Sequence, residues 1–324
     1  MEFILVNKVW DKFCIVGLGN HAKNRIIPAL TESKKDITGL VTSKPKRKIL
    51  SCNHFLTVDE ALINLSKSTV FVIVTPPKAH YKQAKQILDF GRDVVIEKPG
   101  FVKFQDIEEI IKSKNFEKNI VFEAFMYKYS TLYEKFLVYW KNNYKEIVSI
   151  TSNFYIPSIP KNSFRDQNDI TSSCLYDMGC YGMSLLSDID IDVTNINISE
   201  VEIKNGKLNL IKLVGIYNHI SININFGLSN KYENVIKIVK KNNNTVRFWP
   251  FFKGVEEKKF IEQIYNSESK FSEINDLNAF SKMFNIDRQK LLKNQKLRFN
   301  KMLKISKKLN SLEKELKFSI KTNY

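Results

Sequence analysis

The first third of the chain shows short apolar runs that alternate with stretches of helical periodicity. The apolar runs predict strands at residues 13–16, 37–41, 70–74, 94–96 and 120–123, and the periodic stretches predict helices at 22–31 and 81–90. The run at 70–74 is continuously apolar, which is typical of a strand buried on both faces. Strands that alternate with helices predict a parallel sheet with right-handed crossovers.

The pattern changes after about residue 145. Longer strands are predicted at residues 147–155, 201–203, 208–217, 220–226 and 234–239, with a helix near 174–187. Apolar and polar residues alternate from Ser221 to Phe226, and Asn205-Gly206 marks a hairpin turn. We therefore expect an α/β protein whose second half is built on a large, mostly antiparallel sheet, with the boundary between the halves at 124–146.

The end of the chain has a helical pattern. Apolar residues recur there in steps of three to four positions, with the first step doubled, at Leu292, Phe299, Met302, Ile305, Leu309, Leu312 and Leu316. A coiled coil would also show this pattern, but the pattern lasts for fewer than four heptads. We therefore favour a final amphipathic helix, about 292–318, that packs on the protein's own core.

The composition is that of an ordinary globular protein with an excess of basic residues. The 324 residues carry a formal net charge of +17, and 43% of them are hydrophobic. The lysines are spread along the whole length without an arginine–aromatic cluster, so we do not expect specific nucleic-acid binding. No apolar run approaches the roughly 20 residues that span a bilayer, and the first residues lack a signal-peptide pattern. We expect a cytoplasmic protein with no membrane partner.

The cysteines and histidines do not form a metal-binding pattern. The spacing fits neither a zinc site nor a disulfide framework for the four cysteines, which are Cys14, Cys52, Cys174 and Cys180. We interpret them as free thiols. The four histidines also lack the spacing of metal ligands, so the sequence predicts no metal.

A glycine-rich turn follows the first predicted strand. It reads Gly17-Leu18-Gly19-Asn20-His21-Ala22, a G-x-G-x-x-A pattern between a strand and a helix. The first glycine permits a tight turn, the second lets the backbone approach a pyrophosphate, and the small alanine lets helix and strand pack closely. The N-terminus of the helix presents free N–H groups to the phosphates. We expect Gly17, Gly19, Asn20 and His21 to bind a dinucleotide; a purely structural turn is the alternative.

The residues after the second predicted strand bear on which dinucleotide binds. NAD-binding proteins usually carry Asp or Glu there, which holds the ribose 2′-hydroxyl. Here the segment Val41-Thr42-Ser43-Lys44-Pro45-Lys46-Arg47-Lys48 has no carboxylate. Ser43, Lys44 and Arg47 suit a 2′-phosphate, so we expect NADP, with NAD as the alternative. A solvated basic loop would look the same.

Thr75-Pro76-Pro77 ends the strand predicted at 70–74. Open α/β sheets bind ligands beyond the carboxyl ends of their strands, so Thr75 and Pro76 are candidate cofactor contacts. His80 lies at the start of the next helix. It is either a cofactor contact or a helix-start residue without a chemical role.

Four sequence segments occur in order along residues 12–190. They are the G-x-G-x-x-A turn, TPPKAHYKQAKQILDFGRDVVIEKP at 75–99, EAFMYKYS at 123–130 and YDMGCYGMSLL at 176–186. Together they resemble the glucose–fructose oxidoreductase/inositol dehydrogenase (Gfo/Idh/MocA) family. The resemblance implies a Rossmann domain at 1–124, an α/β domain with a large open sheet at 125–291, and a last helix that returns to the Rossmann domain. It also implies a homo-oligomer built through the open sheet face.

The resemblance places the family's catalytic lysine at Lys98, within Glu97-Lys98-Pro99. An ammonium group beside a nicotinamide would bind the reacting oxygen and stabilise its alkoxide character. Lys98 is thus expected to contact both cofactor and substrate. Glu97 and Pro99 would hold it in place, with Pro99 after a cis peptide bond. A surface lysine at a strand end is the alternative.

The segment Asp177-Met178-Gly179-Cys180-Tyr181 resembles the family's second catalytic segment. Many members have histidine where this chain has Tyr181, which resembles the glucose–fructose oxidoreductase and dihydrodiol dehydrogenase branch. Asp177 and Tyr181 stand one helical turn apart, so both are expected to face one pocket. Tyr181 would transfer the proton together with Lys98, and Asp177 would orient the substrate. The alternatives are a Tyr181 that only packs and an Asp177 that caps a helix.

The sequence departs from that branch in the loop before this segment. Thr171-Ser172-Ser173 replaces the usual Gly-Gly, which changes the entry loop. Arg165 precedes the loop and is a candidate for binding a carboxylate or phosphate of the substrate; an ordinary surface arginine is equally consistent. Glu123 and Lys128 are expected near the pocket in a supporting role.

The sequence therefore predicts an NADP- or NAD-dependent oxidoreductase. It would move a hydride between the nicotinamide and a hydroxyl or carbonyl carbon of a sugar, sugar nucleotide or related polyol. The alternative is a non-catalytic regulator of the same fold that senses NAD(P) or a sugar. The presence of Lys98, Asp177 and Tyr181 together favours the enzyme.

Overall fold

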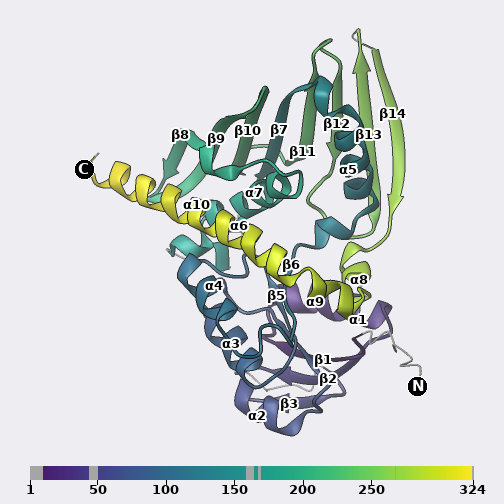
Figure 1. Ribbon diagram of the computed structural model, residues 1–324, viewed down its shortest axis with the longest axis vertical. Coiled ribbons are helices and arrows are strands. Elements are labelled where there is room, and N and C mark those ends of the chain that lie inside the picture. Colours follow the sequence, from purple (N-terminus) through teal and green to yellow (C-terminus); the bar gives the residue numbers. More distant parts are fainter. Residues whose placement is uncertain (1–9, 44–49, 158–163, 167–168, 267, 323–324) are drawn as a thin grey trace. The chain divides into compact units, whose positions relative to one another are not determined.

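The computed structural model describes residues 10–43, 50–157, 164–166, 169–266 and 268–322, the side chains of the last five excepted. The chain divides into two compact units. The first spans Met1–Phe125 with Phe280–Asn300, and the second spans Met126–Ala279 with Lys301–Tyr324. Each unit has its own sheet (Figure 1).

The sheet of the first unit is parallel, as the alternation of strands and helices predicts. Its described strands are β1 (Lys12–Val16), β2 (Asp36–Val41), β3 (Asn53–Phe55), β4 (Val70–Ile73), β5 (Val94–Glu97) and β6 (Val121–Ala124). They lie in the order β3-β2-β1-β4-β5-β6, with every neighbouring pair parallel. This is the order of a doubly wound dinucleotide-binding sheet. From β1 the strands are added in one direction to β3, and from β4 they are added in the opposite direction to β6, so the strand order reverses between β1 and β4.

Short helices accompany this sheet, and α3 and α4 lie beside it in Figure 1. Pro77 opens α3, where a missing N–H costs nothing, and Gly91 with φ 76° follows its end. The short elements β3, α2 and α4 were not predicted, because three to eight residues carry too little periodicity. The described helices are η1 (Ala22–Ile26), α1 (Ile27–Glu32), α2 (Val58–Asn64), α3 (Pro77–Asp89), α4 (Phe104–Ile111), α8 (Ala279–Phe284) and α9 (Arg288–Lys293).

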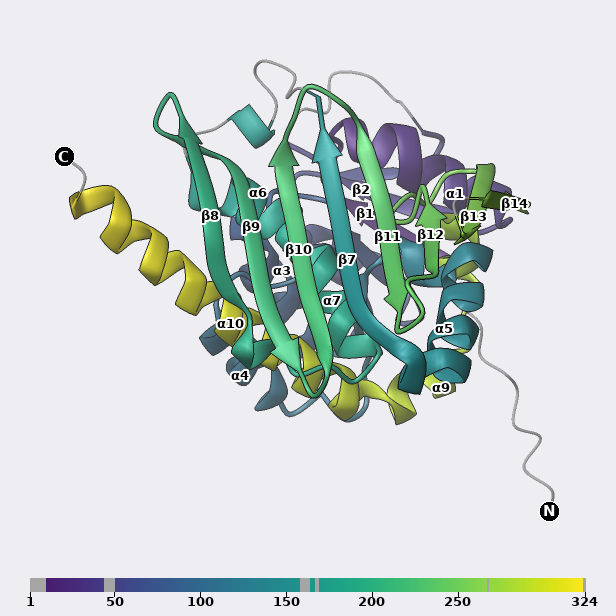
Figure 2. The same cartoon turned by 90° about the horizontal axis from the view of Figure 1, so that it is seen from above.

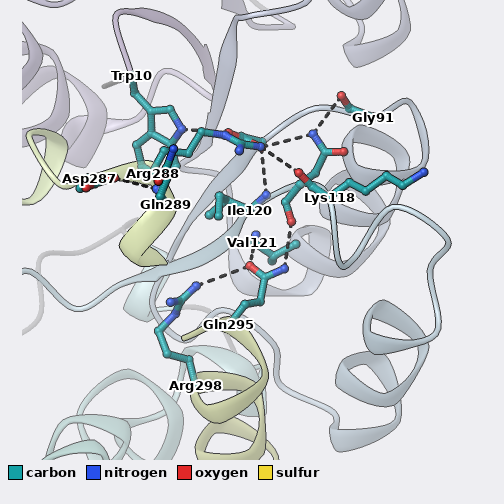
Figure 3. A network of polar contacts seen from close by, with 12 residues as sticks. Trp10, Gly91, Lys118, Ile120, Val121, Asp287, Arg288, Gln289, Gln295 and Arg298 are labelled. Atoms are coloured by element: carbon teal, nitrogen blue, oxygen red, sulfur yellow. Dashed lines mark hydrogen bonds and ion pairs between the residues drawn. The ribbon is translucent and has the colours of Figure 1, made fainter. Parts of the chain in front are cut away.

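A polar network fastens α9 and the start of the last helix, α10 (Gln295–Thr322), to the first unit (Figure 3). The buried carboxylate of Asp93 accepts hydrogen bonds from Trp10 Nε1 at 2.9 Å and from Arg288 Nε at 2.6 Å. Gln295 Oε1 accepts the N–H of Val121 at 2.9 Å, and Gln295 Nε2 donates to the carbonyl of Asn119 at 2.9 Å. Residues 280–300 therefore complete the first unit.

The sheet of the second unit is mostly antiparallel, which confirms the expected fold class. Its described strands are β7 (Ile147–Ile156), β8 (Asn197–Lys204), β9 (Lys207–Tyr217), β10 (Ile220–Leu228), β11 (Glu233–Lys240), β12 (Thr245–Trp249), β13 (Glu257–Tyr265) and β14 (Glu268–Asp276). The order is β14-β13-β12-β11-β7-β10-β9-β8, and only the β7–β10 pair among these is parallel. Asn205 and Gly206 both have positive φ in the β8–β9 turn, as the Asn-Gly pair predicts.

Helices cover one face of this second sheet. Figure 2 shows β8, β9, β10, β7 and β11 side by side, with α7 behind them. Gly182 lets α7 approach β10, because a Cβ there would lie 2.5 Å from a methyl carbon of Ile224. The described helices are η2 (Met126–Tyr129), α5 (Thr131–Asn143), η3 (Tyr144–Glu146), η4 (Phe164–Asp166), η5 (Ile170–Ser172), α6 (Cys174–Asp177), α7 (Gly179–Asp188), η6 (Val193–Asn195) and the part of α10 after Asn300.

The long last helix, α10, has one apolar stripe. Met302, Leu309, Leu312 and Leu316 are all buried, while lysines occupy the exposed faces. The three- to four-residue periodicity thus corresponds to packing against the protein's own core. Over the described residues, every helix is too short or too polar to cross a membrane.

Candidate functional site

The glycine-rich turn has an open outer side at the carboxyl edge of the first sheet. Gly17 has φ 99°, and a Cβ there would lie 2.9 Å from the methyl carbon of Thr75, so the turn requires glycine. Among the described residues, a Cβ at Gly19 would meet nothing within 4 Å. Packing by these residues therefore gives no reason for a glycine at 19, whereas a ligand approaching the backbone would. Asn20 and His21 are exposed beside it at the start of the helix.

The Glu97 carboxylate connects the end of β5 with this turn. Its Oε1 lies 2.9 Å from Nε2 of His21, and its side chain is 9% exposed. Burial by itself would raise the pKa of Glu97, but His21 and then Lys98 outweigh burial and hold it below the ordinary value. Glu97 is therefore a buried carboxylate, and half-buried Lys98 follows it directly at the same edge of the sheet.

His80 is enclosed between two backbone carbonyls. Its Nε2 lies 2.7 Å from the carbonyl oxygen of Thr75, its Nδ1 lies 3.0 Å from that of Pro99, and the residue is 1% exposed. Burial lowers the pKa of His80, against the opposing effect of the carbonyls. The expectation of a direct cofactor contact is therefore corrected: the side chain ties the end of β4 to the loop after β5.

The loop after β5 is held from a second side by Glu123. Oε1 of Glu123 accepts the N–H of Gly100 at 2.7 Å. The peptide bond between Lys98 and Pro99 is cis, as the resemblance implies. His80 and Glu123 together fix the backbone that carries Lys98, which fits the supporting role expected for Glu123.

The residues expected at a 2′-phosphate are described only in part. Ser43 is exposed just after β2, and no carboxylate stands between Val41 and Ser43. Lys44 and Arg47 lie outside the described residues.

In the second unit, Asp177 and Arg165 bind each other. Arg165 Nε donates to Oδ2 of Asp177 at 2.6 Å, and Nη2 donates to Oδ1 at 3.3 Å. The charge of Asp177 raises the pKa of Arg165 despite burial. The expected substrate anchor thus has a partner in its own chain. The helix-cap alternative for Asp177 is wrong, because Asp177 ends α6 and α7 begins after Met178.

Tyr181 lies in an aromatic cluster of the second unit. It is 5% exposed, its hydroxyl donates to the Met126 sulfur at 3.7 Å, and its ring meets the edge of Phe154 at 5.3 Å. Lys128 also lies in this unit, where Nζ pairs with Asp188 at 2.9 Å.

A cavity of about 930 Å³ lies within the second unit. Its size is in the range of small-molecule sites. One wall carries Asp177, Arg165, Ser172 and Ser173, and others come from the β8–β9 hairpin, the end of β10, and α10. Tyr181 is not among the residues that line it, so Asp177 and Tyr181 do not share this cavity as their spacing led us to expect.

Several parts of the site were not foreseen from the sequence. The contact of His21 with Glu97 and the participation of α10 in the cavity have no local signal, because each joins distant segments. Asn205-Gly206 indicated a hairpin but not what the hairpin faces. Among the described residues, no group of three His, Cys, Asp or Glu side chains is placed to hold a metal ion.

These features define a class of protein: a Rossmann-type nucleotide-binding unit joined to an α/β unit with a large sheet and a cavity. Residues 12–125 match the oxidoreductase family GFO_IDH_MocA, described as having an NAD-binding Rossmann fold. This match over residues 12–125 confirms the resemblance seen in the motifs.

A curated relative matches over a shorter stretch. It is a putative oxidoreductase, YteT, from Bacillus subtilis, 25% identical over 158 residues. The match covers 44% of this chain and 36% of that protein, so the chain spans about a third of the length of the relative.

Solved structures match over nearly the whole chain. KijD10, a 3-ketoreductase from Actinomadura kijaniata crystallised with NADP and TDP-benzene, has a TM-score of 0.79 at 14% identity. The match covers 94% of this chain and 97% of that one. A Gfo/Idh/MocA family oxidoreductase from Vibrio cholerae has a TM-score of 0.71 at 14% identity, over 96% of this chain and 99% of that one. At these identities the likeness shows a shared fold.

Proposed function

We propose that the protein is an NADP-dependent oxidoreductase that acts on a hydroxyl or carbonyl carbon of a sugar-like substrate. One observation carries the proposal. The glycine-rich turn and Glu97-Lys98-Pro99 lie at the same edge of the Rossmann sheet, joined by the 2.9 Å contact of His21 with Glu97. Lys98 directly follows Glu97 in the chain, and Glu97 contacts His21 of the glycine-rich turn.

The open turn fits a dinucleotide. Gly17 and Gly19 bring the backbone close to a pyrophosphate, and Asn20 and His21 start the helix whose N–H groups face it. A nicotinamide bound beyond this turn supplies or accepts the hydride. Ser43, with Lys44 and Arg47, would receive a 2′-phosphate, which favours NADP over NAD. Thr75 and Pro76 would border the cofactor.

The chain's own groups manage charge and protons in this proposal. The ammonium of Lys98 donates a hydrogen bond to the reacting oxygen and stabilises its negative charge. Glu97, His80 and Glu123 hold the Lys98 backbone. Asp177 binds substrate hydroxyls after exchanging its bond to Arg165. Tyr181 contacts Met126 and does not line the cavity, so its hydroxyl has to turn from the Met126 sulfur before it can exchange a proton with the substrate oxygen.

The sugar-like substrate rests on the motif resemblance and on the cavity. Hydroxyl, amide and carboxylate groups line the cavity at Ser172, Ser173, Asn209 and Asp177, next to apolar side chains such as Leu210. This mixture suits a polyhydroxylated ring. The solved 3-ketoreductase KijD10 was crystallised with a TDP compound, which extends the substrate range to be assayed to sugar nucleotides.

The experiment combines cofactor titration with a turnover assay. NADPH and NADH are titrated by fluorescence, and absorbance of the reduced nicotinamide is followed with polyols, sugars and sugar nucleotides. We expect tighter binding of NADPH. Lys98→Met should lower kcat by about 10²- to 10⁴-fold while NADPH binding changes little.

The matched control is Lys103→Met, an exposed lysine in the loop that leads into α4. It should retain both binding and turnover. A Lys98→Met variant as active as the control would refute the role of Lys98. The alternative regulator of the same fold would bind NADPH but turn over none of the substrates, and Tyr181→Phe would then change nothing measurable.

A further inference from the structure

The distal half of α10 reaches the cavity of the second unit. Leu316 and Lys317 are among the residues that line it, and Leu316 is 3% exposed. Leu316 therefore presents an apolar surface to a cavity that Asp177 and the neighbouring serines line with polar groups. The distal part of α10 and the helix α6, which carries Asp177, both belong to the second unit.

The same part of α10 is bonded to the residue before Asp177. The hydroxyl of Tyr176 donates to Oε2 of Glu313 at 2.6 Å and accepts from Nδ2 of Asn310 at 2.7 Å. Burial, followed by the Glu313 carboxylate, raises the pKa of Tyr176 well above its usual range, so the phenol stays a donor. The other carboxylate oxygen of Glu313 pairs with Lys317.

Tyr176 links Glu313 of α10 to the cavity wall, because it directly precedes Asp177. It is 0% exposed in α6, a helix of four residues that ends at Asp177. A helix this short has few hydrogen bonds of its own, so its orientation depends on what its side chains contact. The link through Tyr176 to Glu313 therefore helps fix the direction of the Asp177 carboxylate.

We propose that the distal half of α10 is part of the substrate site. Leu316 is a specificity-determining residue that packs against the C–H face of a sugar ring, and Glu313 is a positioning residue that acts on Asp177 through Tyr176. This inference rests on the function proposed above. It adds that the distal half of α10 forms one wall of the substrate cavity.

The test uses the full chain loaded with NADP⁺. Binding of dTDP-glucose, UDP-glucose and myo-inositol is measured by calorimetry, and KM and kcat are measured for each probe that supports turnover. Leu316→Trp should weaken binding of the bound probe, or raise its KM, at least tenfold, because it fills part of the cavity. NADPH affinity should stay within twofold of wild type.

A pair of variants at position 313 separates positioning from general stability. Glu313→Gln keeps an oxygen that accepts the Tyr176 hydrogen bond and should retain wild-type kcat/KM within a few-fold. Glu313→Leu removes the acceptor and should lower kcat/KM at least tenfold with NADPH affinity unchanged. Lys314→Gln, an exposed neighbour on the same helix, is the control and should match wild type.

The outcomes separate this inference from the proposed function. A wild-type enzyme that turns over a probe, with Leu316→Trp and Glu313→Leu equal to it, overturns the inference and leaves the function standing. Wild-type protein that binds NADPH but none of the three probes also overturns the inference. Failure to bind NADPH at millimolar concentration overturns the proposed function itself.

Discussion

Replacing Arg288 by Met should open the first unit locally, because Arg288 holds a buried carboxylate. Asp93 is 8% exposed and receives two bonds from this guanidinium, at 2.6 Å from Nε and 2.9 Å from Nη2. Trp10 Nε1 and the N–H of Ile120 donate to the same carboxylate, each at 2.9 Å (Figure 3). Methionine would fill much of the space but leave the carboxylate without a cation.

The size of the effect follows from the burial of the pair. Removing one partner of a buried ion pair costs about 3–5 kcal/mol. The side chain of Arg288 is 22% exposed, so water replaces part of what is lost, and the other donors remain. We therefore expect the lower end, about 3 kcal/mol, which corresponds to a change of roughly 100-fold in the equilibrium for opening.

Hydrogen exchange measured by mass spectrometry gives a local readout. Amides of β6 and of the segment before it should exchange roughly 100-fold faster in Arg288→Met, because their protection depends on this part of the unit staying closed. Lys290→Met, an exposed residue of the same helix α9, is the control. In the double variant with Asp93→Asn, part of the loss should be recovered, since no charge is left unpaired. Equal exchange in Arg288→Met and Lys290→Met would refute the reasoning.

Two further predictions concern stability and assembly. The pKa of Glu97 lies below its ordinary value of 4.5, so its contribution to stability is present above pH 4.5 and is lost as the pH falls through the native value. The difference in Tm between wild type and Glu97→Gln should therefore be larger at pH 7 than at pH 4; a larger difference at pH 4 would contradict the assignment. The resemblance also implies an oligomer through the open face of the second sheet, where Ile216 on β9 is 70% exposed. Ile216→Glu should then sediment as a smaller species than wild type, whereas Ile63→Glu, at a position 73% exposed in the first unit, should not; a monomeric wild type would contradict this expectation.

Local sequence patterns determined the elements around the nucleotide-binding edge. Strands such as β4 and β5 are buried along their whole length, so their continuous apolar runs predict them from the sequence. The positive φ of Gly17 and the Asn205-Gly206 turn follow from local backbone sterics. By contrast, β13 and β14 were not predicted, because charged residues interrupt their apolar pattern. Lys259 of β13 is fully buried, and its ammonium pairs with Asp276 at 2.9 Å and donates to the carbonyl of Lys253 at 2.7 Å.

The tertiary structure alone decided how the candidate site residues are paired. His80 and Arg165 are chemically able to bind a ligand, and nothing local reveals that the chain supplies their partners at Pro99 and Asp177. The contact of Tyr176 with Glu313 joins residues 137 positions apart. Periodicity and motif spacing report only on neighbours within a few turns of chain, so contacts at this separation are fixed by packing of the folded units.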